Sequence, residues 1–128
     1  AGPVGAAEGV GRVGEGGGVS GAASRRKGQR AELAVARMLR AFGWAARTSR
    51  SVQGVQGGAD LVTDCPLSIE VKDHQRTELA AWLDQAVRQA EPGRPGVVFA
   101  KRRGRANAAE WYAVMRVADL LELVRRIP

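Results

Sequence analysis

The 128-residue sequence contains a single cysteine and a single histidine. One cysteine excludes an internal disulfide and favours a reducing compartment such as the cytoplasm. One cysteine and one histidine cannot supply the four nitrogen and sulfur ligands of a structural zinc site. Any bound metal must therefore be held by oxygen atoms, which is typical of magnesium, manganese or calcium.

Acidic residues and long apolar runs are also scarce. Thirteen Asp and Glu stand against 20 Lys and Arg, which gives a net charge of +7. This excess favours a polyanionic partner, nucleic acid first and an anionic membrane surface second, although a merely soluble basic protein is the plainer alternative. No apolar run approaches the length of a membrane span, and the first residues lack the basic start and apolar block of a secretory signal.

Large side chains are nearly missing from residues 1–23, which are rich in glycine. Such a segment buries too little apolar surface to offset its ordering entropy, so we predict a flexible tail. Residues 24–128, in a chain that is 45% hydrophobic, are predicted to form one domain.

Apolar periodicity and turn residues predict an α/β domain in residues 24–128. A first helix should begin with Ser24 as its N-cap and end at Gly43, a residue that tolerates the left-handed conformation. Its apolar side is formed by Ala31, Val35, Met38, Leu39 and Phe42. Strands are expected at 44–48, 59–63, 67–72, 97–101 and 111–115, and further helices at 76–90 and 117–127.

The connection between the third and fourth expected strands passes through a helix. Such a connection predicts a parallel pair with a right-handed crossover. We therefore expect a central mixed five-stranded sheet flanked by helices.

The stretch "GGADLVTDCPLSIEVKD" carries two acids on adjacent expected strands. If residues 64–66 form the turn of a hairpin, Asp60 lies opposite Glu70, and Lys72 lies on the same face. Carboxylates that are so close either share a proton or hold a cation, and a hard divalent ion suits oxygen ligands. The alternative is that Asp60 caps a strand while Glu70 and Lys72 form an exposed ion pair.

Glu32 is a third candidate acid. In the first expected helix it lies on the side of Val35 and Leu39, at the inward edge of the apolar stripe. An acid in such a position is usually paired or ligates a cation. Alternatively, Glu32 reaches outward to solvent or caps Gln29.

Together, Glu32, Asp60, the Glu70-Val71-Lys72 triplet and Gln85 resemble the PD-(D/E)XK nuclease superfamily. The likeness spans about residues 25–125 and is greatest to archaeal and phage-type Holliday junction resolvases. "KGQRAELAVARMLRAFGW" is similar to the first helix of that group, "GGADLV" and "SIEVKD" to its two metal-binding motifs, and "WLDQA" to its supporting helix. Ala59 departs from the pattern, because family members often carry proline there. The resemblance implies a restriction-endonuclease-like fold.

The resemblance also implies roles for these residues. Asp60, Glu70 and the Val71 carbonyl would bind Mg²⁺ or Mn²⁺, and Glu32 would hold the same ion or a second one. Lys72 would orient and help deprotonate the attacking water or stabilise the phosphoryl oxygens, and Gln85 would tether Lys72 or the water. The implied activity is hydrolysis of DNA to 3′-hydroxyl and 5′-phosphate ends.

Three basic runs surround this acidic set in the sequence. Cations at the start of the first expected helix would oppose the helix dipole, so phosphate contacts would explain them better than helix stability. Solvated charged surface is the alternative for each run, and His74 is either a phosphate contact or an exposed loop residue. The candidate nucleic-acid contacts are Arg25, Arg26, Lys27 and Arg30; Arg47, Ser49, Arg50 and Ser51; His74; and Lys101, Arg102, Arg103 and Arg105.

Few aromatic residues are available for stacking on bases, since aromatics make up 5% of the chain. We therefore expect recognition of backbone geometry in branched or double-stranded DNA, and by resemblance a symmetric homodimer. Trp82, Trp111 and the helix around Leu120–Leu123 are candidates for the dimer surface or, equally, for the monomer core. The competing functions are a nuclease of another specificity, acting on linear, flap or damaged DNA, and a non-catalytic nucleic-acid-binding module.

Overall fold

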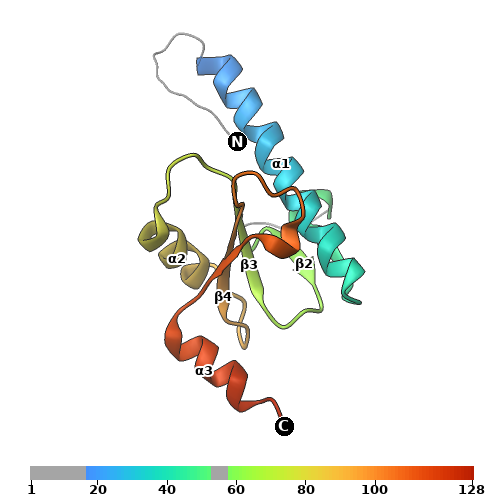
Figure 1. Ribbon diagram of the computed structural model, residues 1–128, viewed down its shortest axis with the longest axis vertical. Helices are drawn as coiled ribbons and strands as arrows, with labels where there is room; N and C mark the ends of the chain where they lie inside the picture. The colour runs from blue at the N-terminus through green and yellow to red at the C-terminus, as the bar shows by residue number, and fades with distance from the viewer. Residues whose placement is uncertain (1–16, 53–57) are drawn as a thin grey trace.

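The computed structural model describes residues 17–52 and 58–128 (Figure 1). Residues 1–16, most of the predicted flexible tail, lie outside the described residues, as do residues 53–57. The elements follow the predicted order of helices and strands: α1 (Gly17–Ala41), β1 (Ala46–Thr48), the short 3-10 helix η1 (Ser49–Ser51), β2 (Leu61–Thr63), β3 (Ser68–Lys72), α2 (Leu79–Arg88), β4 (Gly96–Ala100), the 3-10 helix η2 (Ala108–Glu110), β5 (Tyr112–Val114) and α3 (Val117–Arg125).

Helix α1 begins earlier than the sequence predicts. It starts at Gly17, so Ser24 lies inside the helix and is not its N-cap. Residues 17–23 are therefore helical and not part of a tail, because a packed helix extends at low cost once it is nucleated. At the other end Gly43 has φ 99°, and Trp44 N–H donates to the Leu39 carbonyl at 3.0 Å. This Schellman-type end confirms the predicted role of Gly43.

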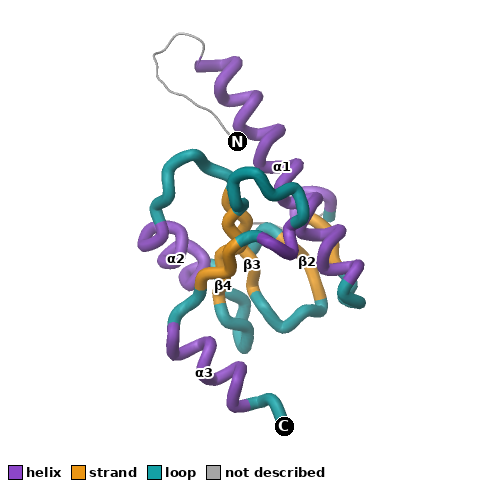
Figure 2. The backbone as a smooth tube through the Cα atoms, in the orientation of Figure 1, coloured by secondary structure: helices purple, strands orange, loops and turns teal. Residues whose placement is uncertain are grey.

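The strands form two sheets instead of the single five-stranded sheet predicted. β1 pairs antiparallel with β2, whereas the second sheet has the order β3-β4-β5. The pair β3–β4 is parallel, as predicted, and runs from Ser68 opposite Gly96 to Lys72 opposite Ala100. Figure 2 shows the strands in orange and the helices around them in purple.

The predicted hairpin between β2 and β3 does not form because its backbone groups are engaged elsewhere. The Asp60 carbonyl accepts a hydrogen bond from Ser49 N–H at 2.8 Å, and the Val71 N–H donates to the Asp60 carboxylate at 2.8 Å. A single backbone bond, from Asp60 N–H to the Ile69 carbonyl at 2.9 Å, links the two segments. The strands are thus joined at one point only, beside the acidic residues.

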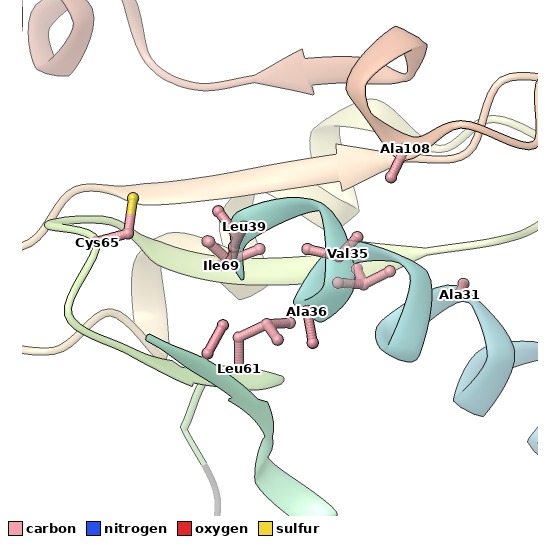
Figure 3. Close-up of a cluster of buried hydrophobic side chains, with 10 residues drawn as sticks. Ala31, Val35, Ala36, Leu39, Leu61, Cys65, Ile69 and Ala108 are labelled. Carbon is pink, nitrogen blue, oxygen red and sulfur yellow. The ribbon is translucent and has the colours of Figure 1, made fainter. Parts of the chain in front are cut away.

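Two apolar clusters cover the opposite faces of β3 and β4. The larger cluster packs α1 and the small sheet against β3, and Figure 3 shows Val35 and Leu39 of α1 gathered with Ile69 of β3 and Leu61 of β2. The smaller one packs Trp82 and Ala86 of α2 against β4. Because helices cover both faces, β3 is buried along almost its whole length, which is typical of a parallel strand.

Some predicted core positions are placed differently. Phe42 follows the end of α1 and is 68% exposed, so it does not belong to the apolar side of the helix. Trp82 is buried in the smaller cluster, and Trp111 packs partly buried against the larger one. Both tryptophans therefore belong to the monomer core, one of the two alternatives that the sequence leaves open.

Helix α3 projects away from the strands at one end of the molecule (Figure 1) and has no buried residue. Its apolar side, formed by Val117, Leu120, Leu121 and Val124, is 46–71% exposed. Asp119 and Glu122 of the helix, with Arg126 directly after it, instead line a small hollow together with Arg94 and Gly96. None of the helices in the described part of the chain is long and apolar enough to cross a membrane.

Candidate active site

Asp60 and Glu70 meet beside the middle of β3. Asp60 lies directly before β2, and its Oδ2 atom accepts the Val71 N–H at 2.8 Å. Glu70 points from β3 and is 5% exposed. Both side chains line one cavity of about 430 Å³, together with Glu32, Lys72 and His74. The two acids converge as predicted, but through the Asp60–Val71 hydrogen bond and not through paired strands.

Removal from water is the largest cause of the shifted pKa values of both carboxyls. It raises the pKa of Asp60, a change that the Val71 N–H opposes and the nearby Glu32 charge reinforces. For Glu70, burial and then the Asp60 charge raise the pKa to about 7, against the opposing effect of Lys72. Two neighbouring acids whose pKa values are raised in this way are stabilised when they bind a proton or a cation.

Lys72 ends β3 and points into the same cavity. Its Nζ atom donates a hydrogen bond to Gln85 Oε1 at 2.8 Å and lies 3.6 Å from Glu70 Oε2. Gln85 comes from α2, whose backbone passes so close to β4 that a Cβ atom at Gly96 would collide with the Ala86 carbonyl. The predicted contact between Gln85 and Lys72 is thus present, while the catalytic roles of both remain predictions.

Gln89 is a site residue that the sequence analysis missed. It caps the end of α2, four residues after Gln85. With its amide nitrogen turned toward Glu70, Gln89 donates to Glu70 Oε1 at 2.9 Å and to the Gly58 carbonyl at 3.3 Å. The signal was available in the sequence, because residues four apart lie on the same side of a helix.

Glu32 lies on α1 at the opposite wall of the cavity and is 6% exposed. Its two carboxylate oxygens accept hydrogen bonds from Arg50, from Nε at 2.8 Å and from Nη2 at 3.0 Å. This two-point bond raises the pKa of the Arg50 guanidinium. Glu32 therefore neither reaches outward nor caps Gln29. Arg50 neutralises this buried acid, and its predicted contact with DNA stays a prediction.

Asp73 is a second residue that the sequence analysis missed. Its side chain is 8% exposed, and its oxygens lie 3.7 Å from Lys27 Nζ and 3.8 Å from Lys101 Nζ. It directly follows Lys72 and connects α1 with the basic loop after β4. Two of the predicted phosphate contacts, Lys27 and Lys101, consequently lie near one carboxylate that lines the cavity.

The other basic candidates lie on α1, on β1 and in the loop after β4. Because α1 begins at Gly17, Arg25, Arg26 and Arg30 lie inside the helix, and the argument from the helix dipole no longer applies to them. All three are exposed, as are Arg47, Arg102, Arg103 and Arg105. These side chains stay predicted nucleic-acid contacts.

Three further candidates have contacts within the protein. Ser49 Oγ donates to the Ala59 carbonyl at 2.5 Å, and Ser51 Oγ donates to the Thr48 carbonyl at 2.7 Å. The His74 ring lies 5.5 Å from the Trp82 ring. Burial, followed by the charges of Lys72 and Lys27, lowers the pKa of His74, which favours a neutral imidazole over a charged phosphate contact.

A family comparison is consistent with this arrangement. Residues 23–127 match the family described as "Phage putative PDDEXK endonuclease". The chain belongs to this family. The match confirms the resemblance to PD-(D/E)XK nucleases of the phage type and spans every site residue named above. No curated protein and no solved structure matches the chain significantly.

PD-(D/E)XK nucleases typically use divalent metals, so the oxygen donors of this chain can be tested for fit. Within residues 17–52 and 58–128, no group of three or more His, Cys, Asp or Glu side chains is arranged to hold a metal ion. Asp60 and Glu70 fit a hard cation, since both offer carboxylate oxygens in one cavity and a cation would relieve their repulsion. Glu32 does not fit while Arg50 occupies both of its oxygens. The three-carboxylate set predicted from the sequence is thus reduced to two acids.

Proposed function

We propose that this protein is a metal-dependent, structure-selective DNA endonuclease that cuts branched DNA such as four-way junctions. It would hydrolyse phosphodiester bonds to leave 3′-hydroxyl and 5′-phosphate ends. The observation that carries the proposal is that the half-buried Asp60 and the buried Glu70 line one cavity with Lys72. Membership of the phage PDDEXK endonuclease family supports the reaction class.

Asp60 and Glu70 would hold Mg²⁺ or Mn²⁺, with the Val71 carbonyl as a further predicted ligand. When bound, the ion would lower the pKa of a coordinated water and neutralise charge on the phosphate. The Val71 N–H and the Gln89 amide fix one oxygen of each carboxylate. The acids are therefore oriented by the protein before any ion arrives, as expected of metal ligands.

Lys72 would contact the attacking water or a phosphoryl oxygen. Gln85 holds its Nζ atom at 2.8 Å, which limits the rotation of an otherwise flexible side chain. A fixed ammonium in a partly buried cavity stabilises developing negative charge more strongly than a mobile one in water.

DNA would lie across the rim of the cavity. The exposed arginines of α1 and of the loop after β4 provide positive charge, and no motif in the sequence reads base edges. Binding through phosphates is independent of sequence and weakens steeply as salt rises. This property suits an enzyme that recognises the shape of a DNA branch.

A homodimer is part of the proposal, and α3 is its candidate contact. The helix exposes Val117, Leu120, Leu121 and Val124 on one side. Asp119 and Glu122 line the hollow on the other side of the helix, so two α3 helices around a two-fold axis would meet through their apolar sides. Leu121→Glu should therefore give a monomer in light scattering, whereas a dimer with unchanged mass would exclude α3 as the contact.

The proposal is tested by digesting four-way, flap and linear DNA of equal length with and without Mg²⁺. We expect cutting of the four-way substrate with Mg²⁺ only, and loss of cutting but not of DNA binding in Glu70→Gln. Glu91→Gln, a change at an exposed acid outside the cavity, is the matched control. Equal cutting of linear DNA would exclude junction selectivity, and DNA binding without any cutting would indicate a non-catalytic module.

A further inference from the structure

A second cavity, of about 330 Å³, adjoins the acidic one. It lies between α2 and β5, and its walls include Trp82, Leu79, Tyr112 and Val114. Its volume falls in the range of about 300–1,000 Å³ that is usual for small-molecule sites. The residues that line it are mainly apolar or aromatic, in contrast to the charged residues of the acidic cavity.

Three rings, those of His74, Trp82 and Tyr112, line this second cavity, although aromatic residues are rare in the sequence. The rings of His74 and Trp82 lie 5.5 Å apart and are tilted by 37°. Tyr112 is 56% exposed, and the Arg102 guanidinium lies 5.9 Å from the centre of its ring. Although the sequence holds few aromatic residues, these rings offer one surface on which a base could stack.

The second cavity shares a wall with the acidic one. Lys72 and His74 line both, and Lys101 adds a second lysine at the aromatic cavity. No Asp or Glu is among the described residues that line it. A ligand there would combine a flat apolar body with a nearby negative charge, because the walls are aromatic and the adjoining basic residues attract anions.

We propose that the aromatic cavity binds an unpaired nucleobase whose neighbouring phosphate lies at the acidic cavity. A base inside a duplex is stacked between two neighbours and paired with a base of the other strand. It cannot enter such a pocket without being extruded. Bases at a branch, bulge or gap can enter at lower cost, and stacking on aromatic side chains tolerates every base. This inference rests on the proposed function and gives a physical reason for selectivity toward DNA structure.

The test measures binding in EDTA, so it does not depend on cleavage. Fluorescence anisotropy compares a fully paired duplex with the same duplex carrying one unpaired thymidine. Stacking predicts that the wild type prefers the bulged duplex by about 5- to 100-fold. Tyr112→Ala should lose this preference, whereas Tyr112→Phe, which keeps the ring, should retain it.

Two further variants control the result. Ala113→Leu narrows the cavity from β5 without removing an aromatic ring and should also lose the preference. Phe42→Ala removes an exposed aromatic that does not line the cavity and should leave the preference unchanged. Equal binding of both duplexes by the wild type, or an unchanged preference in Tyr112→Ala, would overturn the proposal. Cutting of four-way DNA despite either result would show that the nuclease function stands without this pocket.

Discussion

The two walls of the acidic cavity present glutamates that are equally buried but differently paired. On the α1 wall Glu32 is 6% exposed, and on the β3 wall Glu70 is 5% exposed. Glu32 receives two hydrogen bonds from Arg50. Glu70 shares its surroundings with Asp60, and its cationic neighbour Lys72 lies 3.6 Å away and is also bonded to Gln85. Burial alone therefore does not identify a metal ligand, because the partner decides whether the acid still needs a cation.

The negative charge on the α1 wall is balanced by a cationic partner, whereas the negative charge on the β3 wall is not fully balanced. Arg50 balances Glu32, so this pair positions α1 against the loop of η1. On the β3 wall, the Asp60 charge contributes to raising the pKa of Glu70 to about 7. A divalent cation would therefore stabilise the β3 wall more than the α1 wall, because it would relieve the repulsion between Asp60 and Glu70.

The largest expected effect comes from comparing the two glutamates directly. Glu70→Gln should reduce cleavage of four-way DNA on the order of 1,000-fold, because it removes a ligand for the ion that stabilises phosphate charge. Glu32→Gln should reduce it less, since Arg50 already neutralises Glu32. Single-turnover rates with Mg²⁺ measure both. Equal losses would mean that Glu32 leaves Arg50 to act as a ligand, and the contrast between the walls would be wrong.

The glutamines of α2 should have the next largest effect. Gln85→Leu and Gln89→Leu remove hydrogen bonds to Lys72 and Glu70, and supporting residues of this kind are typically worth about 10- to 100-fold in activity or metal affinity. Gln85→Leu should lower the cleavage rate, and Gln89→Leu should also raise the Mn²⁺ concentration needed for half-maximal rate. Asp84→Asn, on the exposed side of the same helix, is the matched control. If it has the same effect as the glutamine variants, the loss is one of helix stability.

The pair on the α1 wall should matter mainly for stability. Arg50→Met leaves the buried Glu32 carboxylate without its partner and should lower the free energy of unfolding by about 2 kcal/mol, less than for a fully buried pair because Arg50 is half exposed. The double variant Glu32→Gln/Arg50→Met should recover part of this loss. Urea unfolding of the four proteins forms a double-mutant cycle. Additive effects would show that the two side chains are not coupled.

The smallest effect concerns pH in the absence of metal. Glu70 has a pKa of about 7 in the folded protein against an ordinary value of 4.5, so the folded state binds the proton more tightly. Its contribution is fully present below pH 4.5 and is lost as pH rises through 7. The free energy of unfolding in EDTA should fall by about 1–2 kcal/mol over this range, after allowance for solvent screening. Glu70→Gln should lack this fall, and an identical pH profile in the variant would contradict the raised pKa.

The sequence predicted the features that depend on local pattern. The order of helices and strands, the glycine end of α1 and the parallel β3–β4 pair follow from periodicity and turn residues. The convergence of Asp60 and Glu70 was also predicted, although by pairing β2 with β3. That pairing does not form because the Asp60 carbonyl bonds to Ser49 and the Val71 N–H bonds to the Asp60 side chain. The sequence around these residues does not reveal either hydrogen bond.

Other features depend on contacts between distant segments. Arg50 was expected on DNA, but it reaches Glu32 18 residues away in sequence. The outward apolar side of α3 was also hidden, because an amphipathic pattern does not say which side faces the domain. The aromatic cavity could not be predicted either, because the composition gives the number of aromatic residues but not their positions in the fold.

The central claim is that Asp60 and Glu70 share a divalent cation. Calorimetric titration of Mn²⁺ into the protein without DNA tests it most directly, with Asp60→Asn, Glu70→Gln and the control Glu91→Gln measured in parallel. The account predicts saturable binding to the wild type and to Glu91→Gln, and at least tenfold weaker binding to each of the other two variants. Binding that is unchanged in both Asp60→Asn and Glu70→Gln, or absent from the wild type, would contradict it.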